Sequence, residues 1–322
     1  MDISVILCTY NGRKVISPTI EHLTKQNVPS TITWEFILVD NASTDGTAEY
    51  TMKLWELLNS NVKLTVVYEG MPGLIYARKA GLNAAKGDVI IFCDDDNWLD
   101  ENYISLAYSY MKENPNIGIL GGYGDVVIDK NTKLPEWWEL DGNCNNYAVG
   151  KQLKESGNAN NRGYIWGAGM VSRKDILEKV FDERFPFLMT GRSGNLVLSG
   201  EDSEICSRVR ILGYDLFYYS QLKYKHYMTT NRLTEEYLNK LVRGFDNVYE
   251  MQLEYKAAVM YVNIDITEKF RLFFVRYFNR IIHSKNKRKC DLYRQYNAYV
   301  FRFKGYVLPK YQVISNFIKA YC

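Results

Sequence analysis

The first 94 residues alternate between short apolar segments and amphipathic ones. Apolar, β-branched runs predict strands, and apolar residues at helical spacing predict helices. The expected strands are 3–10, 34–41, 62–69 and 88–94, and the expected helices are 15–26, 43–59 and 72–87. Nearly continuous apolar strands that alternate with helices are typical of parallel sheets covered on both faces. The sequence therefore predicts an α/β fold with a Rossmann-like, mostly parallel sheet and helices on both faces.

Polar residues stand where three of these strands end. They are Thr9-Tyr10, Asp40-Asn41 and the acidic run Asp94–Asp96. Ligands of open parallel sheets bind beyond the carboxyl ends of the strands. Three successive carboxylates after a buried strand repel one another, and a hard divalent cation, Mg²⁺ or Mn²⁺, that joins them to phosphate oxygens would offset this. The alternative is a solvated turn in which aspartate caps a helix.

The second half of the chain continues the pattern and then changes. We expect a helix near 101–115, a polar loop over 130–151, and a strand with Gly167 and Gly169 followed by a helix within 164–180. A helix starting near Glu201 and a strand from Tyr214 complete this part. From about Leu233 two amphipathic helical segments follow, 233–261 and 266–289. We therefore predict two regions, a catalytic domain over 1–230 and a basic, aromatic helical region over 231–322.

Charge is unevenly divided between these regions. Residues 231–322 carry 17 Lys and Arg against 8 Asp and Glu, whereas residues 1–230 carry 23 against 29. The segment 269–322 holds 13 basic residues and one acidic residue, Asp291, among Phe and Tyr. Such a segment can lie on an anionic membrane surface. It can instead pack on the catalytic body or form a homodimer, and no nucleic-acid recognition motif is present.

The six cysteines form no CxxC pair, which favours reduced thiols and a cytoplasmic protein. The N-terminus shows no basic segment ahead of an apolar stretch, so no signal peptide is expected. No uninterrupted apolar stretch is long enough for a spanning helix. The expected location is the cytoplasm, with peripheral attachment to the inner face of the plasma membrane as a further option.

Five segments carry a family resemblance when taken in order: VILCTYNGR, ILVDNASTDGT, PGLIYARKAGLNAAKGDVIIFCDDDNW, WGAGMVSRK and SGEDSEICSRVRILGYDL. This series spans about residues 3 to 230 and resembles the family 2 glycosyltransferases with the GT-A fold. The resemblance implies an inverting hexosyltransferase that moves a sugar from a nucleoside-diphosphate sugar, with a UDP-sugar favoured. It implies a glycan or lipid-linked acceptor, in surface polysaccharide or lipid-linked glycan assembly. Processive members carry a QxxRW motif, which is absent here, so addition of a single sugar is expected.

The resemblance also assigns the nucleotide side of the site. It places Asp40 on the nucleotide base, and Thr9 and Tyr10 at the nucleotide. Arg78 matches a basic residue near the base and the diphosphate. Asp94 matches the aspartate near the ribose, with Asp95 beside it in the nucleotide site.

The resemblance assigns the metal and the base as well. Asp96 matches the metal-binding member of the D-x-D motif, and Asp202 matches the catalytic base. Asp202 is expected at a helix N-terminus, where the helix dipole favours a carboxylate. The neighbouring Glu201 is a weaker candidate for the base. His226 matches a late metal ligand, and a packed histidine with no ligand role is an equal alternative.

Small and aromatic residues complete the expected site. Gly167-Ala168-Gly169 would let the backbone approach the sugar or the acceptor closely, or would form a bend in a strand. Among Trp137, Trp138 and Trp166 we expect one to stack on a sugar and the others to lie in the core.

Two other functions fit the acidic strand end. One is a Mg²⁺-dependent nucleotidyltransferase or phosphohydrolase, although the phosphate loops GxxxxGK[ST] and GxGxxG are absent. The other is a non-catalytic sugar-binding or membrane-binding scaffold. The presence of Asp40, Asp94, Asp96 and Asp202 together argues against a scaffold.

Overall fold

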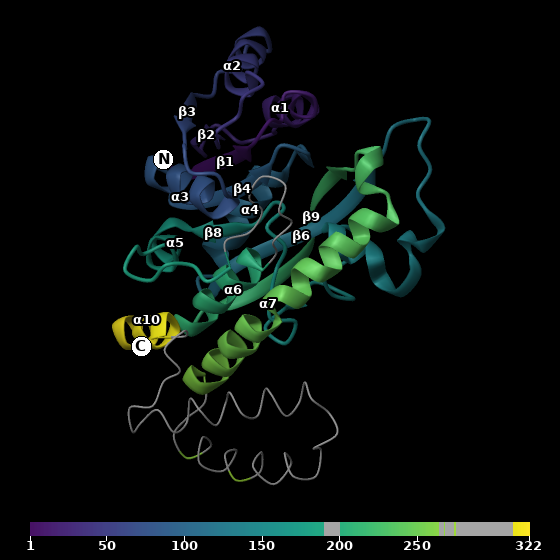
Figure 1. Ribbon diagram of the computed structural model, residues 1–322. Coiled ribbons are helices and arrows are strands. Elements are labelled where there is room, and N and C mark those ends of the chain that lie inside the picture. The colour runs from purple at the N-terminus through teal and green to yellow at the C-terminus, as the bar shows by residue number, and fades with distance from the viewer. Residues whose placement is uncertain (190–199, 264–266, 268–273, 275–311) are drawn as a thin grey trace.

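A nine-stranded sheet forms the centre of the computed structural model, which describes residues 1–189, 200–263 and 312–322 and the single residues 267 and 274 (Figure 1). Eight strands follow the order β3-β2-β1-β4-β8-β6-β9-β5, and β7 pairs with β9. The strands are β1 Ile3–Thr9, β2 Trp34–Asp40, β3 Leu64–Tyr68, β4 Val89–Asp94, β5 Asn97–Leu99, β6 Ile117–Val127, β7 Gly157–Asn158, β8 Val171–Arg173 and β9 Asp215–Tyr227.

Helices cover both faces of the sheet, as the sequence predicted. The α-helices are α1 Ile16–Thr24, α2 Thr47–Leu57, α3 Leu74–Ala84, α4 Tyr103–Glu113, α5 Lys174–Val180, α6 Glu201–Ile211, α7 Glu235–Val262 and α10 Gln312–Tyr321. Helices α1, α2 and α4 pack in one apolar cluster with one side of β1, β2 and β4. Helices α3, α5 and α6 pack in a second cluster with the other side of these strands. Alternate side chains of a strand point to opposite faces, so both faces are buried.

The parallel half of the sheet, β3-β2-β1-β4, brings three polar strand ends to one edge. Thr9 lies opposite Asp40 in the ladder between β1 and β2. Cys8 lies opposite Asp94 in the ladder between β1 and β4. The acidic run therefore begins at the level of Cys8, one residue before Thr9, at the edge where a ligand was predicted to bind.

The other half of the sheet is mixed. Strand β8 runs antiparallel between β4 and β6, whereas β6 and β9 are parallel to each other. The strand and helix expected within 164–180 are β8 Val171–Arg173 and α5 Lys174–Val180, but Gly167 and Gly169 precede the strand. Residues 164–170 form an irregular segment and a turn, with Gly169 at a φ of 67°. The segment 130–151, expected as a polar loop, holds two 3-10 helices, η1 Glu136–Trp138 and η2 Leu140–Tyr147.

Helix α7 packs along α6 and also contacts α10 (Figure 1). It begins where Thr234 caps it by accepting a hydrogen bond from the Tyr237 backbone N–H. A buried ion pair between Glu204 and Arg208 of α6 receives Tyr255 of α7, whose hydroxyl donates to Glu204 at 2.6 Å. Helix α10 adds Ile314 and Phe317 to the apolar cluster at this junction.

Much of the C-terminal region falls outside the described residues. The second amphipathic segment, 266–289, lies almost wholly outside the described residues. In the described ranges, no helix combines the length and the apolar character needed to cross a bilayer.

Candidate active site

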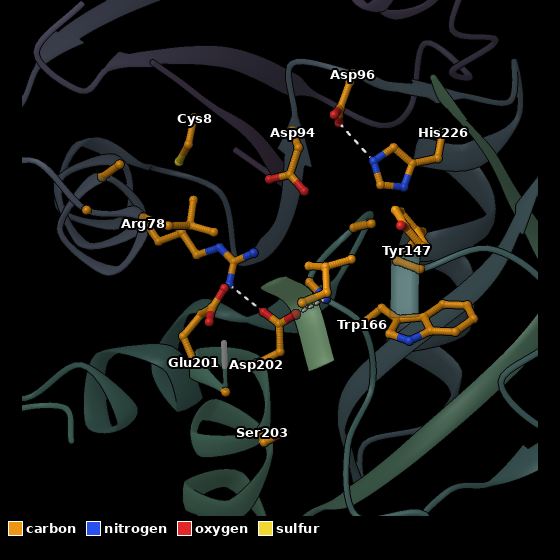
Figure 2. Close-up of a pocket in the computed structure, with 18 of the residues that line it drawn as sticks. Cys8, Arg78, Asp94, Asp96, Tyr147, Trp166, Glu201, Asp202, Ser203 and His226 are labelled. Atoms are coloured by element: carbon orange, nitrogen blue, oxygen red, sulfur yellow. Dashed lines mark hydrogen bonds and ion pairs between the residues drawn. The ribbon is translucent and has the colours of Figure 1, made fainter. Parts of the chain in front are cut away.

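A cavity of about 640 Å³ opens at the carboxyl edge of the parallel strands. Its walls come from the ends of β1 and β4, the starts of α3 and α6, and the 3-10 helix η2. Most of the predicted site residues line it: Thr9, Tyr10, Arg78, Asp94, Asp95, Asp96, Asp202 and His226. Segments more than 200 residues apart in the chain thus contribute to one site (Figure 2).

Asp202, the predicted base, is held by two donors. Arg78 Nη1 donates to its Oδ1 at 2.7 Å, and the Gly167 backbone N–H donates to its Oδ2 at 2.7 Å (Figure 2). The Asp202 side chain keeps 28% of its surface exposed, whereas that of Arg78 keeps 2%. The two donors fix the orientation of the Asp202 carboxylate toward the cavity.

Arg78 is a buried cation among carboxylates. Burial lowers the pKa of Arg78, but the negative charges of Asp202, Asp94 and Glu201 outweigh this and raise the pKa above its ordinary value. Its guanidinium also lies over the Phe92 ring, 5.3 Å from the centroid. Arg78 therefore pairs with Asp202, and its permanent charge also acts on Asp94.

Two members of the acidic run, Asp94 and Asp95, resist ionisation. Burial raises the pKa of Asp94, and Arg78 opposes the rise. Burial, followed by the charge of Asp96, raises the pKa of Asp95 to about 7, although the Thr9 hydroxyl donates to Asp95 at 2.6 Å and opposes it. A raised pKa means that the ionised cluster costs free energy in this setting. A cation at the rim would offset that cost.

Asp96 faces His226, and the two residues predicted as metal ligands thus lie together. His226 Nε2 is 3.2 Å from Asp96 Oδ1, and the imidazole is 7% exposed (Figure 2). The Nδ1 atom of His226 has no hydrogen-bond partner among the described residues. Within these residues no group of three or more His, Cys, Asp and Glu side chains is arranged to hold a metal. One carboxylate and one imidazole fit a cation that takes its other ligands from water and phosphate.

The net charge of the cavity points to the same requirement. Five carboxylates line it, and two guanidiniums face them; these residues are Asp94, Asp95, Asp96, Glu201 and Asp202, with Arg78 and Arg232. A diphosphate entering such a site would meet an excess of negative charge. A divalent cation would therefore have to accompany it.

Asn41, one of the polar residues at the strand ends, has a structural role that its sequence did not predict. The Asn41 side chain donates to the backbone carbonyls of Glu69 and Met71 and accepts from the Gly73 N–H at 2.7 Å. It thereby fixes the loop that leads into α3 and lines the cavity. Asp40 is not among the lining residues; its carboxylate accepts from the Ser43 N–H at 2.8 Å. Its contact with a nucleotide base stays a prediction.

Among the three tryptophans, Trp166 lines the cavity (Figure 2). Trp138 is 1% exposed and packs on Tyr147 in a separate apolar cluster. Other lining residues had not been predicted: Tyr147 and Tyr164, and Leu241, Phe245 and Gln252 from α7. The α7 residues have no local motif, because only the packing of α7 on η2 brings them to the site.

Solved structures with the same fold include glycosyltransferases. The structure of Staphylococcus aureus TarS residues 1–349 in complex with UDP aligns with a TM-score of 0.52 at 16% identity, covering 94% of this chain and 91% of that chain. The mannosyltransferase PcManGT from Pyrobaculum calidifontis, in complex with GDP-Man and Mn²⁺, aligns with a TM-score of 0.52 at 17% identity, covering 98% and 78%. At these identities the likeness establishes the GT-A fold.

Curated relatives match the N-terminal part of the chain. The poly(ribitol-phosphate) β-N-acetylglucosaminyltransferase TarS of Staphylococcus aureus is 32% identical over 130 residues, which are 40% of this chain and 21% of TarS. The UDP-Glc:α-D-GlcNAc-diphosphoundecaprenol β-1,3-glucosyltransferase WfgD of Escherichia coli is 31% identical over 132 residues, covering 41% of this chain and 48% of WfgD. The alignments thus span about a fifth to a half of these relatives. Residues 4–181, more than half of the chain, match the sequence model of Glycosyl transferase family 2, and the protein belongs to that family.

Proposed function

We propose that this protein transfers one sugar from a nucleoside-diphosphate sugar to an acceptor hydroxyl, with inversion at the anomeric carbon. The observation that carries the proposal is the position of Asp202. Its oriented carboxylate shares one cavity with the acidic strand end that would receive a metal-bound diphosphate. A base and a leaving-group site in one cavity are what a single displacement requires.

The residues divide the chemistry between them. Asp202 takes the proton from the acceptor hydroxyl, whose oxygen then bonds to the anomeric carbon as the bond to the diphosphate breaks. Arg78 and the Gly167 N–H keep the Asp202 carboxylate in place during this step. Asp96 and His226 would hold a Mg²⁺ or Mn²⁺ ion, which supplies positive charge for the departing diphosphate. Trp166 offers an aromatic wall for a sugar ring.

The names of relatives support a donor and a setting. TarS has been solved with UDP and with UDP-GlcNAc, and WfgD is named for UDP-Glc. Another relative is the putative teichuronic acid biosynthesis glycosyltransferase TuaG of Bacillus subtilis. We therefore favour a UDP-hexose donor, which makes the protein a hexosyltransferase, and a glycan or lipid-linked acceptor in surface polysaccharide assembly.

We also propose that the basic region 269–322 holds the protein on the inner, anionic face of the plasma membrane. The support is its charge and its aromatic residues. A lipid-linked acceptor would be reached most readily from that surface. The alternative use of this region is a homodimer contact.

Replacing Asp202 with Asn tests the proposed base. Asn keeps the size of the side chain but cannot accept the proton, so we expect turnover to fall by about 10²–10⁴-fold. UDP binding in the presence of Mn²⁺, measured by calorimetry, should change little. Glu201→Gln, at the weaker candidate, is the matched control and should retain most of the activity.

The donor is identified first, by thermal-shift screening of nucleotide sugars with Mn²⁺. UDP release is then followed with and without glycan acceptors. Normal turnover by the Asp202→Asn protein would remove Asp202 from the role of base. Release of UDP at one rate, whatever acceptor is added, would identify a phosphohydrolase instead of a transferase.

A further inference from the structure

Arg232 lies on the carboxylate that we predict to bind the metal. Its Nη1 atom donates to Asp96 Oδ2 at 2.5 Å, while the other oxygen of Asp96 faces His226 Nε2 at 3.2 Å. The Arg232 side chain is 11% exposed and lines the cavity. From the sequence, Arg232 was only one of the basic residues of the region 231–322. Its position in the structure indicates a specific role in ligand binding.

Two cations cannot share Asp96 without a cost. A divalent ion bound between Asp96 and His226 would lie on the same carboxylate as the Arg232 guanidinium, and like charges at such separations repel strongly in a partly buried site. With no phosphate present, the ion must therefore compete with Arg232 for Asp96. A diphosphate changes this balance, because its negative charge can satisfy both cations.

The surroundings of Arg232 allow it to serve a phosphate. It ends a short 3-10 helix, η3 Thr230–Arg232, that joins β9 to α7. Its Nε atom is buried and has no hydrogen-bond partner among the described residues. A guanidinium presents several donors in one plane, which suits phosphate oxygens. Asp96 satisfies only part of this donor capacity.

We propose that Arg232 occupies Asp96 in place of the divalent cation when the site is empty, and turns to the phosphate oxygens of the donor when cation and diphosphate bind together. This inference rests on the proposed function. Arg232 is then the residue that couples the two ligands: the cation binds weakly alone and tightly with a nucleoside diphosphate. Such coupling is reciprocal, so the nucleotide also depends on the cation.

The test measures Mn²⁺ binding by calorimetry, first to the free protein and then in the presence of UDP. In the Arg232→Gln protein the competing charge is gone, so we expect Mn²⁺ alone to bind about 10-fold more tightly than in the wild type. UDP should bind the Mn²⁺-loaded variant about 10-fold more weakly, because a phosphate donor is lost. The coupling between the two ligands should therefore shrink.

Lys225→Gln is the matched control. Lys225 is exposed, precedes His226 on β9 and lies outside the cavity lining, so the same loss of charge there should leave both affinities unchanged. Arg232→Lys is a second variant that keeps the charge and loses the planar donor group. It should bind Mn²⁺ alone like the wild type and bind UDP with reduced affinity.

The outcomes separate this inference from the proposed function. If the wild type binds neither Mn²⁺ nor UDP, both are wrong. If the wild type binds both ligands but Arg232→Gln shows unchanged or weaker binding of Mn²⁺ alone, only the inference is wrong. Should Arg232→Gln fail to fold, unchanged UDP affinity in Arg232→Lys would overturn the inference, and a reduced affinity would support it.

Discussion

At the scale of the residue, Gly167 leaves the space in which Asp202, the proposed base, pairs with Arg78. A Cβ atom at this position would lie 2.2 Å from Arg78 Nη2 and 2.3 Å from Asp202 Oδ1. Real Cβ atoms do not approach other atoms so closely, so any side chain would push these two groups apart. The absence of a side chain at Gly167 is therefore a condition for the ion pair between Arg78 and Asp202.

Replacing Gly167 with Ala should reduce turnover by about 100-fold, because a shift of the base by about 1 Å spoils its alignment with the acceptor. Gly157→Ala is the control, since a Cβ there has no atom within 4 Å. Steady-state kinetics and thermal melting of both variants would check this. Full activity in Gly167→Ala would show that the alignment of Asp202 tolerates displacement.

The sequence predicted those site residues that sit within local motifs. Asp94–Asp96 follow a buried strand and Asp202 follows a glycine ahead of a helix, and both patterns can be recognised locally. The roles of Asn41 and Arg232 were not predicted, because they depend on partners that only the fold brings close. Asn41 holds a loop about 30 residues away, and Arg232 pairs with Asp96 across 136 positions of the chain. Local sequence carries no sign of such pairings.

At the scale of the element, the parallel strands and their helices were predictable, since continuous apolar runs and helical spacing are strong signals. The stretch 164–170 was not, because its apolar residues line a turn instead of a strand. Burial there comes from packing against α6, where Cys206 Sγ accepts from the Ile165 N–H. The apolar residues of 164–170 are thus explained by burial against α6. They do not indicate a strand.

Helix α10 is tied to the body by Asp182. The Tyr321 hydroxyl donates to Asp182 at 2.6 Å, and Arg184 forms an ion pair with the same carboxylate. The hydrogen bond from Arg184 is the largest cause that holds the pKa of Asp182 well below its usual 3.8, with Tyr321 adding to it. A depressed pKa contributes stability above the unfolded-state value and loses that contribution as the pH falls.

Asp182→Asn should therefore lower the free energy of unfolding by about 1 kcal/mol at pH 7, and by less at pH 3 and below. Urea unfolding of the wild type and the variant at pH 7 and at pH 3 would measure this difference in the free energy of unfolding. Asp129→Asn, which also removes a carboxylate that accepts from a tyrosine hydroxyl, is the control for a partner without arginine. If the difference in the free energy of unfolding stayed constant with pH, the role assigned to the ionised Asp182 carboxylate would be contradicted.

At the scale of the whole molecule, one continuous sheet joins the parallel half β3-β2-β1-β4 to the mixed half, and α7 lines the cavity from the side of the C-terminal region. The division at residue 230 stays a prediction. Helix α7 lies beyond that division, yet its Leu241, Phe245 and Gln252 line the cavity. The C-terminal region thus contributes to the site as well as carrying the charge seen in the sequence.

The membrane proposal predicts binding to vesicles that contain phosphatidylglycerol. Replacing Lys285, Lys287, Arg288 and Lys289 with Gln should weaken this binding at least about 10-fold, since each charge contributes about 1 kcal/mol near an anionic surface. These four residues lie outside the described part of the chain. Replacing the exposed Lys14, Lys25, Lys53 and Lys63 is the charge-matched control.

Vesicle flotation would compare the two sets of variants, and light scattering would report their masses. Equal binding by both sets would count against the membrane role of this segment. If replacing the C-terminal lysines and Arg288 lowered the molecular mass of the protein in solution but left flotation unchanged, a homodimer contact would be favoured.

Helix α6 carries both Asp202 and Glu204, two positions apart. Glu204 accepts hydrogen bonds from the backbone N–H groups of Leu188 and Met189, as well as from Arg208 and Tyr255. Each residue of an α-helix turns the chain by about 100°. An insertion or deletion between Asp202 and Glu204 would therefore turn one carboxylate away from its partners whenever the other kept its place. Natural length variation should avoid this single turn, however freely the loops around it lengthen or shorten.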